Sequence, residues 1–327
     1  PTKFSQHQPY QTVSVDALEK AQAHLEKAIK HLWPVLQHNL DRQESRKKRQ
    51  KEQNMAAHTS LRFTIETESA SSDSEEEKSE KPSMENEAVA TQLYGTHQKL
   101  VNVYLRLAET HLKNYFSSSA MQCLRSAARR LADSMFLINQ AHEPKCADNR
   151  VYLWVRRCQQ QYVSLWEHCG HFARSFGGDS LWRDRGHARA DDVLSVLRDA
   201  EAAFEHNQEQ YSFLQTDPFC SLTGGQVNLY QLSGVVRRTS GTSASLNAIQ
   251  IARKCLSEQH LLRREEREVL VASCLAYQRA IFAHRLLVEN ECDEDKSMLM
   301  SLLLQRLGDA CNEVGKILLN TLRSVLG

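Results

Sequence analysis

The chain has 327 residues, of which 41% are apolar, and a formal net charge of +1. This length allows two or more domain-sized cores or one extended stack, and the near-neutral balance excludes a global attraction to nucleic acid or anionic lipid. Only 12 Gly and 6 Pro are present and alternating β-branched runs are few, so the composition predicts an all-α protein. No apolar run approaches the roughly 20 residues that a membrane-spanning helix needs, and no membrane association is expected.

The first predicted helix begins near Asp16, which can act as its N-cap, and belongs to a helical hairpin portion over residues 1–42. Its apolar stripe consists of Leu18, Ala21, Leu25, Ala28, Ile29 and Leu32. The composition then changes abruptly to a basic run at 42–51 and a Ser/Glu run at 64–87. Because blocks of like charge and low hydrophobicity cannot offset the entropy of ordering, residues 43–86 are predicted to be a disordered charged linker.

Two regulatory features are predicted in this linker. A dense basic cluster fits a nuclear import signal formed by Arg46, Lys47, Lys48, Arg49 and Lys51. The alternative interpretation of this cluster is a solvated charge patch. The predicted localisation is nuclear, with cytoplasmic localisation as the alternative. Ser72 and Ser74 each precede a glutamate by three residues, which is the pattern acidophilic kinases read, and each phosphate would add about −1.5 to −2 charges. Disorder without phosphorylation is the alternative there.

Helical periodicity resumes after the linker and organises the rest of the chain. Repeat-like helices are predicted within 87–217, at 87–112, 118–141, 151–176 and 190–214. Turn-forming Gly, Thr and Ser residues mark an irregular insertion at 218–244, where 227–236 can form a short strand or a docked loop. The C-terminal helical repeats occupy 245–327, with helices at 245–262, 265–291 and 297–326.

The most specific pattern lies in the pair of helices at 87–141. Small and large apolar residues alternate there as Tyr104-x2-Leu107-Ala108-x2-His111, followed by Ala120-x3-Leu124-x2-Ala127. Three- and four-residue steps place each set on one helix face, and the small side chains let the two backbones approach closely. The pattern resembles the tetratricopeptide repeat, with Ala108 in place of the usual Gly and His111 in place of the usual Tyr. It predicts that Leu107, Ala108, Ala120, Leu124 and Ala127 are buried in one hairpin.

Half-copies of the same pattern stand near both ends of the chain. Ala21-x3-Leu25-x2-Ala28 repeats the second helix, and Leu304-x2-Leu307-Gly308-x2-Cys311 repeats the first. The fold class is therefore predicted to be an irregular tetratricopeptide-like array of helical hairpins. Because each end holds only half a repeat, the chain is interpreted as a piece of a longer array. Removal of an initiator Met before Pro1 is the alternative reading of the N-terminus.

Three further stretches carry a second resemblance. Residues 152–162 (YLWVRRCQQQY), 61–68 (LRFTIETE) and 228–232 (NLYQL) resemble the C-terminal half of the erythroid differentiation-related factors, which are large proteins with tetratricopeptide repeats. This resemblance implies a nuclear, non-enzymatic factor that acts on transcription.

Catalytic and metal-binding patterns are weak. His168, Cys169 and His171 bear atoms that zinc favours, but Cys169 points away from one of the histidines on a helix, and no second ligand pair follows at finger spacing. Packing is the preferred interpretation of this cluster. Nucleotide-binding loops and catalytic motifs are missing from the sequence, so neither a cofactor nor an enzymatic activity is expected.

These patterns favour an interaction scaffold that binds a protein partner, with a transcription factor as one candidate. The inner faces of stacked first helices form a groove, whose predicted residues are Asn102, Arg106, Glu109 and Lys113. The alternative is direct nucleic-acid binding through the basic run 42–51. It is considered unlikely, because a near-neutral fold lacks a basic footprint.

Overall fold

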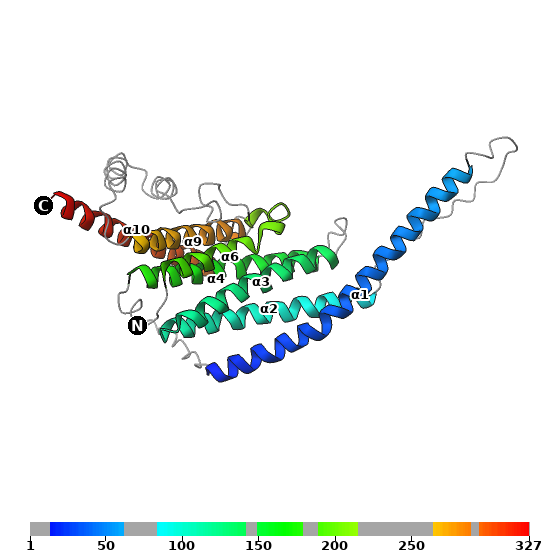
Figure 1. The fold of residues 1–327 in the computed structure, drawn as a ribbon, viewed down its shortest axis with the longest axis horizontal. Coiled ribbons are helices and arrows are strands. Elements are labelled where there is room, and N and C mark those ends of the chain that lie inside the picture. Colours follow the sequence, from blue (N-terminus) through cyan, green and yellow to red (C-terminus); the bar gives the residue numbers. More distant parts are fainter. Residues whose placement is uncertain are drawn as a thin grey trace.

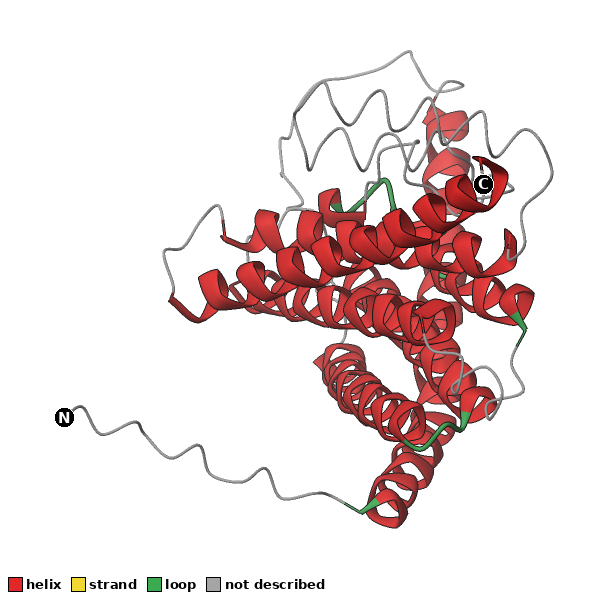
Figure 2. Ribbon diagram, turned by 90° about the vertical axis from the view of Figure 1, so that its left-hand side faces the viewer, coloured by secondary structure: helices red, strands yellow, loops and turns green. Residues whose placement is uncertain are grey.

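The computed structural model describes residues 14–61, 84–141, 149–178, 189–214, 264–288 and 294–326. These ranges contain seven α-helices and no strand, so the predicted all-α class is confirmed. Figure 1 shows the first part of α1 at the bottom of the bundle, α2 and α3 above it, and α9 and α10 at the top, and Figure 2 shows the same helices after a turn of 90°. None of the described helices combines the length and the apolar character that crossing a bilayer requires.

Helices α2 (Met84–Lys113) and α3 (Ser117–Ala141) form an antiparallel hairpin close to the predicted bounds. Its interface buries the five predicted residues, and the three alanines among them are almost fully covered. The connection is tight because Tyr115 adopts a left-handed conformation with φ 63°. This lets the Phe116 amide donate to the His111 carbonyl at 2.9 Å and the Tyr115 amide to the Leu112 carbonyl at 3.2 Å, the two hydrogen bonds of a Schellman C-cap.

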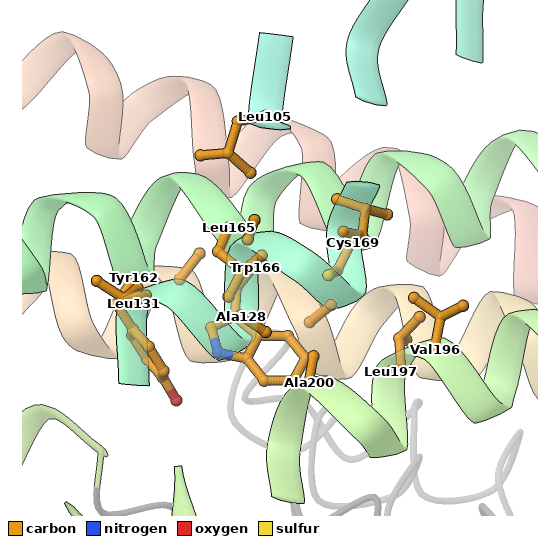
Figure 3. Packing of buried hydrophobic residues seen from close by; sticks show 14 of the residues in the cluster. Leu105, Ala128, Leu131, Tyr162, Leu165, Trp166, Cys169, Val196, Leu197 and Ala200 are labelled. Carbon is orange, nitrogen blue, oxygen red and sulfur yellow. The ribbon is translucent and has the colours of Figure 1, made fainter. Parts of the chain in front are cut away.

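Helix α4 (Asn149–Gly178) packs chiefly against α9 (Arg264–Val288), and α9 in turn packs against α10 (Glu294–Leu326). α4 and α9 approach closely at Gly170, whose carbonyl accepts a hydrogen bond from the Ser273 hydroxyl at 2.8 Å. Helix α6 (Ala190–Ala202) lies across α3 and α9. Figure 3 shows the resulting core, in which side chains from several helices surround the indole of Trp166.

Two predicted boundaries are corrected. Residues 190–214 do not form one helix, because α6 ends at Ala202 and short 3-10 turns follow at Glu205–Asn207 and Ser212–Leu214. Tyr211, Phe213 and Leu214 are all buried, which a single helix face could not achieve at this spacing. The predicted insertion at 218–244 and the predicted helix at 245–262 lie outside the described residues.

The second correction concerns the linker, which was predicted to begin at residue 43. Helix α1 (Val15–Leu61) continues through residues 43–61, while 62–83 lie outside the described residues. No Gly or Pro interrupts 35–61, and Arg, Lys, Gln and Glu are good helix formers. Because the packed part of α1 already supplies the nucleus, propagation past Leu40 needs no second nucleation. Pro34 removes one backbone donor without ending the helix, since the adjacent Trp33 and Leu36 pack against the core.

The buried imidazole of His97 is expected to make the bundle sensitive to acid. It lies on α2 with the Trp33 ring of α1 at 6.0 Å and the Asp133 carboxylate of α3 at 3.8 Å, beyond hydrogen-bonding distance. Burial, assisted by the charge of Arg130, lowers the pKa of His97 to about 3. The pKa of His97 is thus lower in the folded protein than in the unfolded chain, where it is about 6.5. The free energy of unfolding therefore has its full value above about pH 6.5 and decreases as the pH falls toward the pKa of the folded state.

The expected loss from His97 alone is about 2 kcal/mol between pH 7 and pH 5, the free energy of keeping one imidazole neutral over that interval. Urea unfolding at both pH values, compared with His97→Leu, measures it. The comparison is needed because burial raises the pKa of Asp133, which gains its proton more readily in the folded state and acts in the opposite direction. An equal pH dependence in both proteins would contradict the assignment.

Candidate functional site

A pocket of about 490 Å³ opens where α2, α3, α4 and α10 meet. The α2 face contributes Ala108, Glu109, Leu112 and Lys113. The α4 face contributes Glu167, His168, His171, Phe172 and Ser175. Ala120 and Leu124 of α3, Tyr115 of the connection and Arg306 of α10 complete the lining.

The most deeply buried residues of the pocket lining are apolar, and two of them are small. Ala108 and Ala120 face each other across the hairpin and are almost fully covered, as are Leu124 and Phe172 beside them. Larger side chains at the two alanine positions would fill this space, since protein interiors pack with few voids. Ala108 and Ala120 thus belong both to the closed hairpin and to the pocket lining.

The rim of the pocket carries both positive and negative side chains, and these form ion pairs. Lys113 Nζ donates to Glu109 Oε1 at 2.7 Å within α2, and this bond holds the pKa of Glu109 below its usual value. Across the pocket, the Arg306 guanidinium of α10 bonds the Glu167 carboxylate of α4. The Lys113–Glu109 pair is largely exposed and so contributes little to stability. Its members can therefore exchange partners with a ligand at small cost.

Two histidines stand on the α4 wall of the pocket. His168 Nδ1 donates to the Ser164 carbonyl at 2.7 Å, one turn back on the same helix, and this bond orients its ring. Burial, followed by the charges of His168 and Arg174, lowers the pKa of His171. The imidazole of His171 is thus neutral at pH 7 and can offer a polar contact to a ligand without adding charge to the wall.

A second ion-pair group fixes α10 against α4 beside the pocket. Arg174 of α4 donates to Glu313 Oε1 at 2.8 Å and lies 3.5 Å from Asp309 Oδ2, both on α10. These three side chains are partly shielded from solvent. Together with the Glu167–Arg306 pair, they link α10 to α4, while α10 packs mainly on α9.

The structure separates the four predicted groove residues into two groups. Glu109 and Lys113 line the pocket. Asn102 and Arg106 are exposed on the same helix but lie outside the lining, and Asn102 Oδ1 accepts a hydrogen bond from Gln161 Nε2 of α4 at 2.8 Å. Sequence reasoning assigned His168 to packing and did not find Glu167 or Arg306. In the sequence, only the half-copy of the repeat at 304–311 indicated that α10 could be the first helix of a further hairpin.

The predicted regulatory residues are placed only in part. Arg46, Lys48, Arg49 and Lys51 are exposed on α1, and the backbone of Lys47 is helical there. The import role of this run stays a prediction. Ser72 and Ser74 lie outside the described residues.

The His168–Cys169–His171 cluster does not converge, because Cys169 is fully buried while both histidines line the pocket. Burial raises the pKa of Cys158 and of Cys169 to about 12, so both remain thiols at neutral pH. Within the described ranges, no group of three or more His, Cys, Asp or Glu side chains is arranged to hold a metal ion.

Comparison of the chain with protein-family models, with curated proteins and with solved structures gives no match in any of the three.

Proposed function

We propose that the chain is a non-enzymatic helical-repeat scaffold that holds a segment of a partner protein in the pocket between α2, α4 and α10. The observation that carries the proposal is the pocket's anatomy: an apolar floor surrounded by a rim of exchangeable charges. Protein interfaces have this organisation, in which a desolvated apolar centre supplies binding energy and the polar rim supplies orientation.

The packing order supports a tetratricopeptide-like arrangement. α2 pairs with α3 and α4 pairs with α9, while α1 packs on α2 and α10 packs on α9. In an array of hairpins, α2, α4 and α10 would be successive first helices and α1, α3 and α9 second helices. The sequence half-copies agree, since α1 carries the second-helix pattern and α10 the first-helix pattern. The pocket would then lie on the concave side, which is formed by first helices.

The chemistry of the pocket favours a peptide segment with an apolar side chain flanked by charged or amide groups. The apolar anchor would pack against the half-buried Leu112 and Tyr115, and the flanking groups would meet Lys113 and Glu167. A nuclear, transcription-related setting for this partner is inferred from the import signal and from the resemblance in the sequence. Phosphorylation of the Ser/Glu run would then regulate import or partner choice.

Site-specific photo-crosslinking in intact cells tests the scaffold proposal. A benzophenone amino acid at position 175, inside the pocket, is expected to capture a defined protein. The same group at position 99, exposed on α2 outside the pocket, is not. Lys113→Glu should reduce capture at position 175 about three- to tenfold, because it replaces a rim attraction by repulsion, whereas Lys99→Glu should leave it unchanged.

Equal capture at positions 175 and 99 would contradict the assignment of the pocket as the binding site. Capture at 175 that Ala108→Leu does not reduce would also contradict it, since a larger side chain there occupies the apolar floor. Urea unfolding of each variant separates loss of binding from loss of the fold.

A further inference from the structure

The outer part of α1, residues 41–55, projects from the bundle as a single helix and is called the basic arm here. The last α1 side chain that packs on the core is Leu40, and every side chain described from Asp41 to Met55 is exposed. Figure 1 shows α1 leaving the bundle at this point and continuing alone. At about 1.5 Å per residue the 21 helical residues after Leu40 extend roughly 30 Å.

Over residues 41–54 the arm can bind only through polar groups. Residues 41–54 contain no apolar side chain, and the stretch 42–51 contains six basic residues and one acidic residue. A helix that inserts into a membrane surface needs a continuous apolar face, so insertion into lipid does not fit. A protein groove that accepts an amphipathic helix needs the same face. What remains is a polyanion.

The charges are sorted around the helix axis. With about 100° between successive residues, Arg42, Arg46 and Arg49 fall on one side within about 60° of one another, and Lys51 falls on the opposite side. Gln50 stands between these two basic sides, as does position 43. Asp41 and Glu52 lie in the sector facing away from Gln50, with Lys48 beside them, whereas Glu44 falls within about 20° of Lys51.

The three arginines are available for an external anion. Each is exposed, and among the described residues none of them forms an ion pair with a carboxylate. Arginine binds phosphate through a planar fork of donors, which makes it the preferred residue for nucleic-acid backbones. A helix in a duplex groove meets phosphates on both of its sides and base edges in between. The arm carries basic side chains at the two corresponding positions and the amide of Gln50 between them.

The geometry points to B-form duplex DNA as the ligand of the basic arm, with Arg42, Arg46 and Arg49 on one phosphate wall and Lys51 on the other. The B-form major groove, about 12 Å wide, admits an α-helix, whereas the deep, narrow major groove of duplex RNA does not. Gln50 then faces the base edges, Asp41 and Glu52 face solvent, and Glu44 lies beside Lys51. The sequence alone disfavoured this reading because the chain as a whole is nearly neutral and lacks a basic footprint. The site is independent of the pocket proposed above.

Fluorescence anisotropy of the full chain with a labelled 30-base-pair DNA duplex, between 50 and 200 mM salt, tests the inference. If the four cations named above contact phosphates, the logarithm of affinity should fall with the logarithm of salt with a slope of about −3 to −4. The triple variant Arg42→Gln, Arg46→Gln, Arg49→Gln should reduce the magnitude of that slope by about 3 and weaken binding at least tenfold at 100 mM salt.

The matched control removes three exposed lysines from the packed part of the same helix, through Lys20→Gln, Lys27→Gln and Lys30→Gln. Binding of this control is expected to stay within about twofold of the native chain. Circular dichroism verifies that both variants keep their helices. Three results would each overturn the inference: no DNA binding at 50 mM salt, equal affinity for duplex RNA of the same sequence, or equal weakening in the two triple variants. Unchanged capture at position 175 in the arginine variant would leave the pocket proposal standing.

Discussion

Replacing Glu201 by Ala is expected to destabilise the fold by about 3 to 5 kcal/mol, the usual cost of removing one partner from a buried ion pair. Glu201 of α6 bonds Arg279 of α9, and the two side chains are only 4% and 2% exposed. The Arg279 guanidinium also lies over the Trp166 ring, 4.6 Å from its centroid. Without the carboxylate, a desolvated cation stays in the core with only weaker polar contacts.

Chemical denaturation measures this cost, and the same helix provides the control. Asp199 of α6 pairs with Arg125 of α3 at 2.6 Å, but both side chains are partly exposed, so Asp199→Ala should cost within about 1 kcal/mol. The double variant Glu201→Leu, Arg279→Met should recover most of the loss, because an apolar pair of similar volume needs no charge compensation. A cost for Glu201→Ala no larger than that for Asp199→Ala would refute the buried pair.

The second large effect is expected at Gly170, where Ala should destabilise the α4–α9 contact. A Cβ at this position would stand 2.8 to 3.0 Å from three ring atoms of Tyr277, which is fully buried and cannot withdraw. Overpacking of this kind costs about 1 to 3 kcal/mol, more than the roughly 1 kcal/mol that Ala gains over Gly in a helix. Thermal unfolding monitored by circular dichroism should show a lower midpoint for Gly170→Ala.

Two other helical glycines give the opposite expectation. A Cβ added at Gly308 or Gly315 of α10 would meet no neighbouring atom of the described residues within 4 Å, so Ala at either site should stabilise by about 0.5 to 1 kcal/mol. A stabilised Gly170→Ala would show that α4 and α9 do not approach closely there. In a double-mutant cycle, Tyr277→Leu should relieve much of the Gly170→Ala cost, since the two positions are in direct contact.

The α2–α3 hairpin could be predicted from the sequence because the residues that form its interface lie close together along the chain. The spacing of Leu107, Ala108, Ala120 and Leu124 defines both the helix faces and their closeness, and the observed helices agree with the predicted ones within about three residues. The end of the first helix could not be predicted in the same way. The composition of residues 43–61 indicates that few of their side chains can be buried. Whether the helix continues through them depends instead on the packed part of the helix that precedes them.

Only the part of the pocket lining that α2 contributes could be predicted from the sequence. Glu109 and Lys113 follow from the face opposite the packing stripe, but Arg306 is 139 residues from its partner Glu167. No sequence spacing joins two such positions. Their proximity follows from the packing of α4, α9 and α10, in which Gly170 and the Arg174–Glu313 pair set the geometry.

The separation of α4 from its main partner α9 has a consequence for how the chain is made. About 85 residues lie between the end of α4 at Gly178 and the start of α9 at Arg264, whereas α3 follows α2 after three residues, Asn114 to Phe116. Contacts between distant segments form late because loop closure must precede them. At about 5 to 20 residues per second, the ribosome needs roughly 5 to 20 s to complete α9 after α4 has been synthesised. Throughout that interval the side of α4 that α9 will cover faces solvent or a chaperone, so the nascent chain is most prone to aggregate before α9 packs against α4.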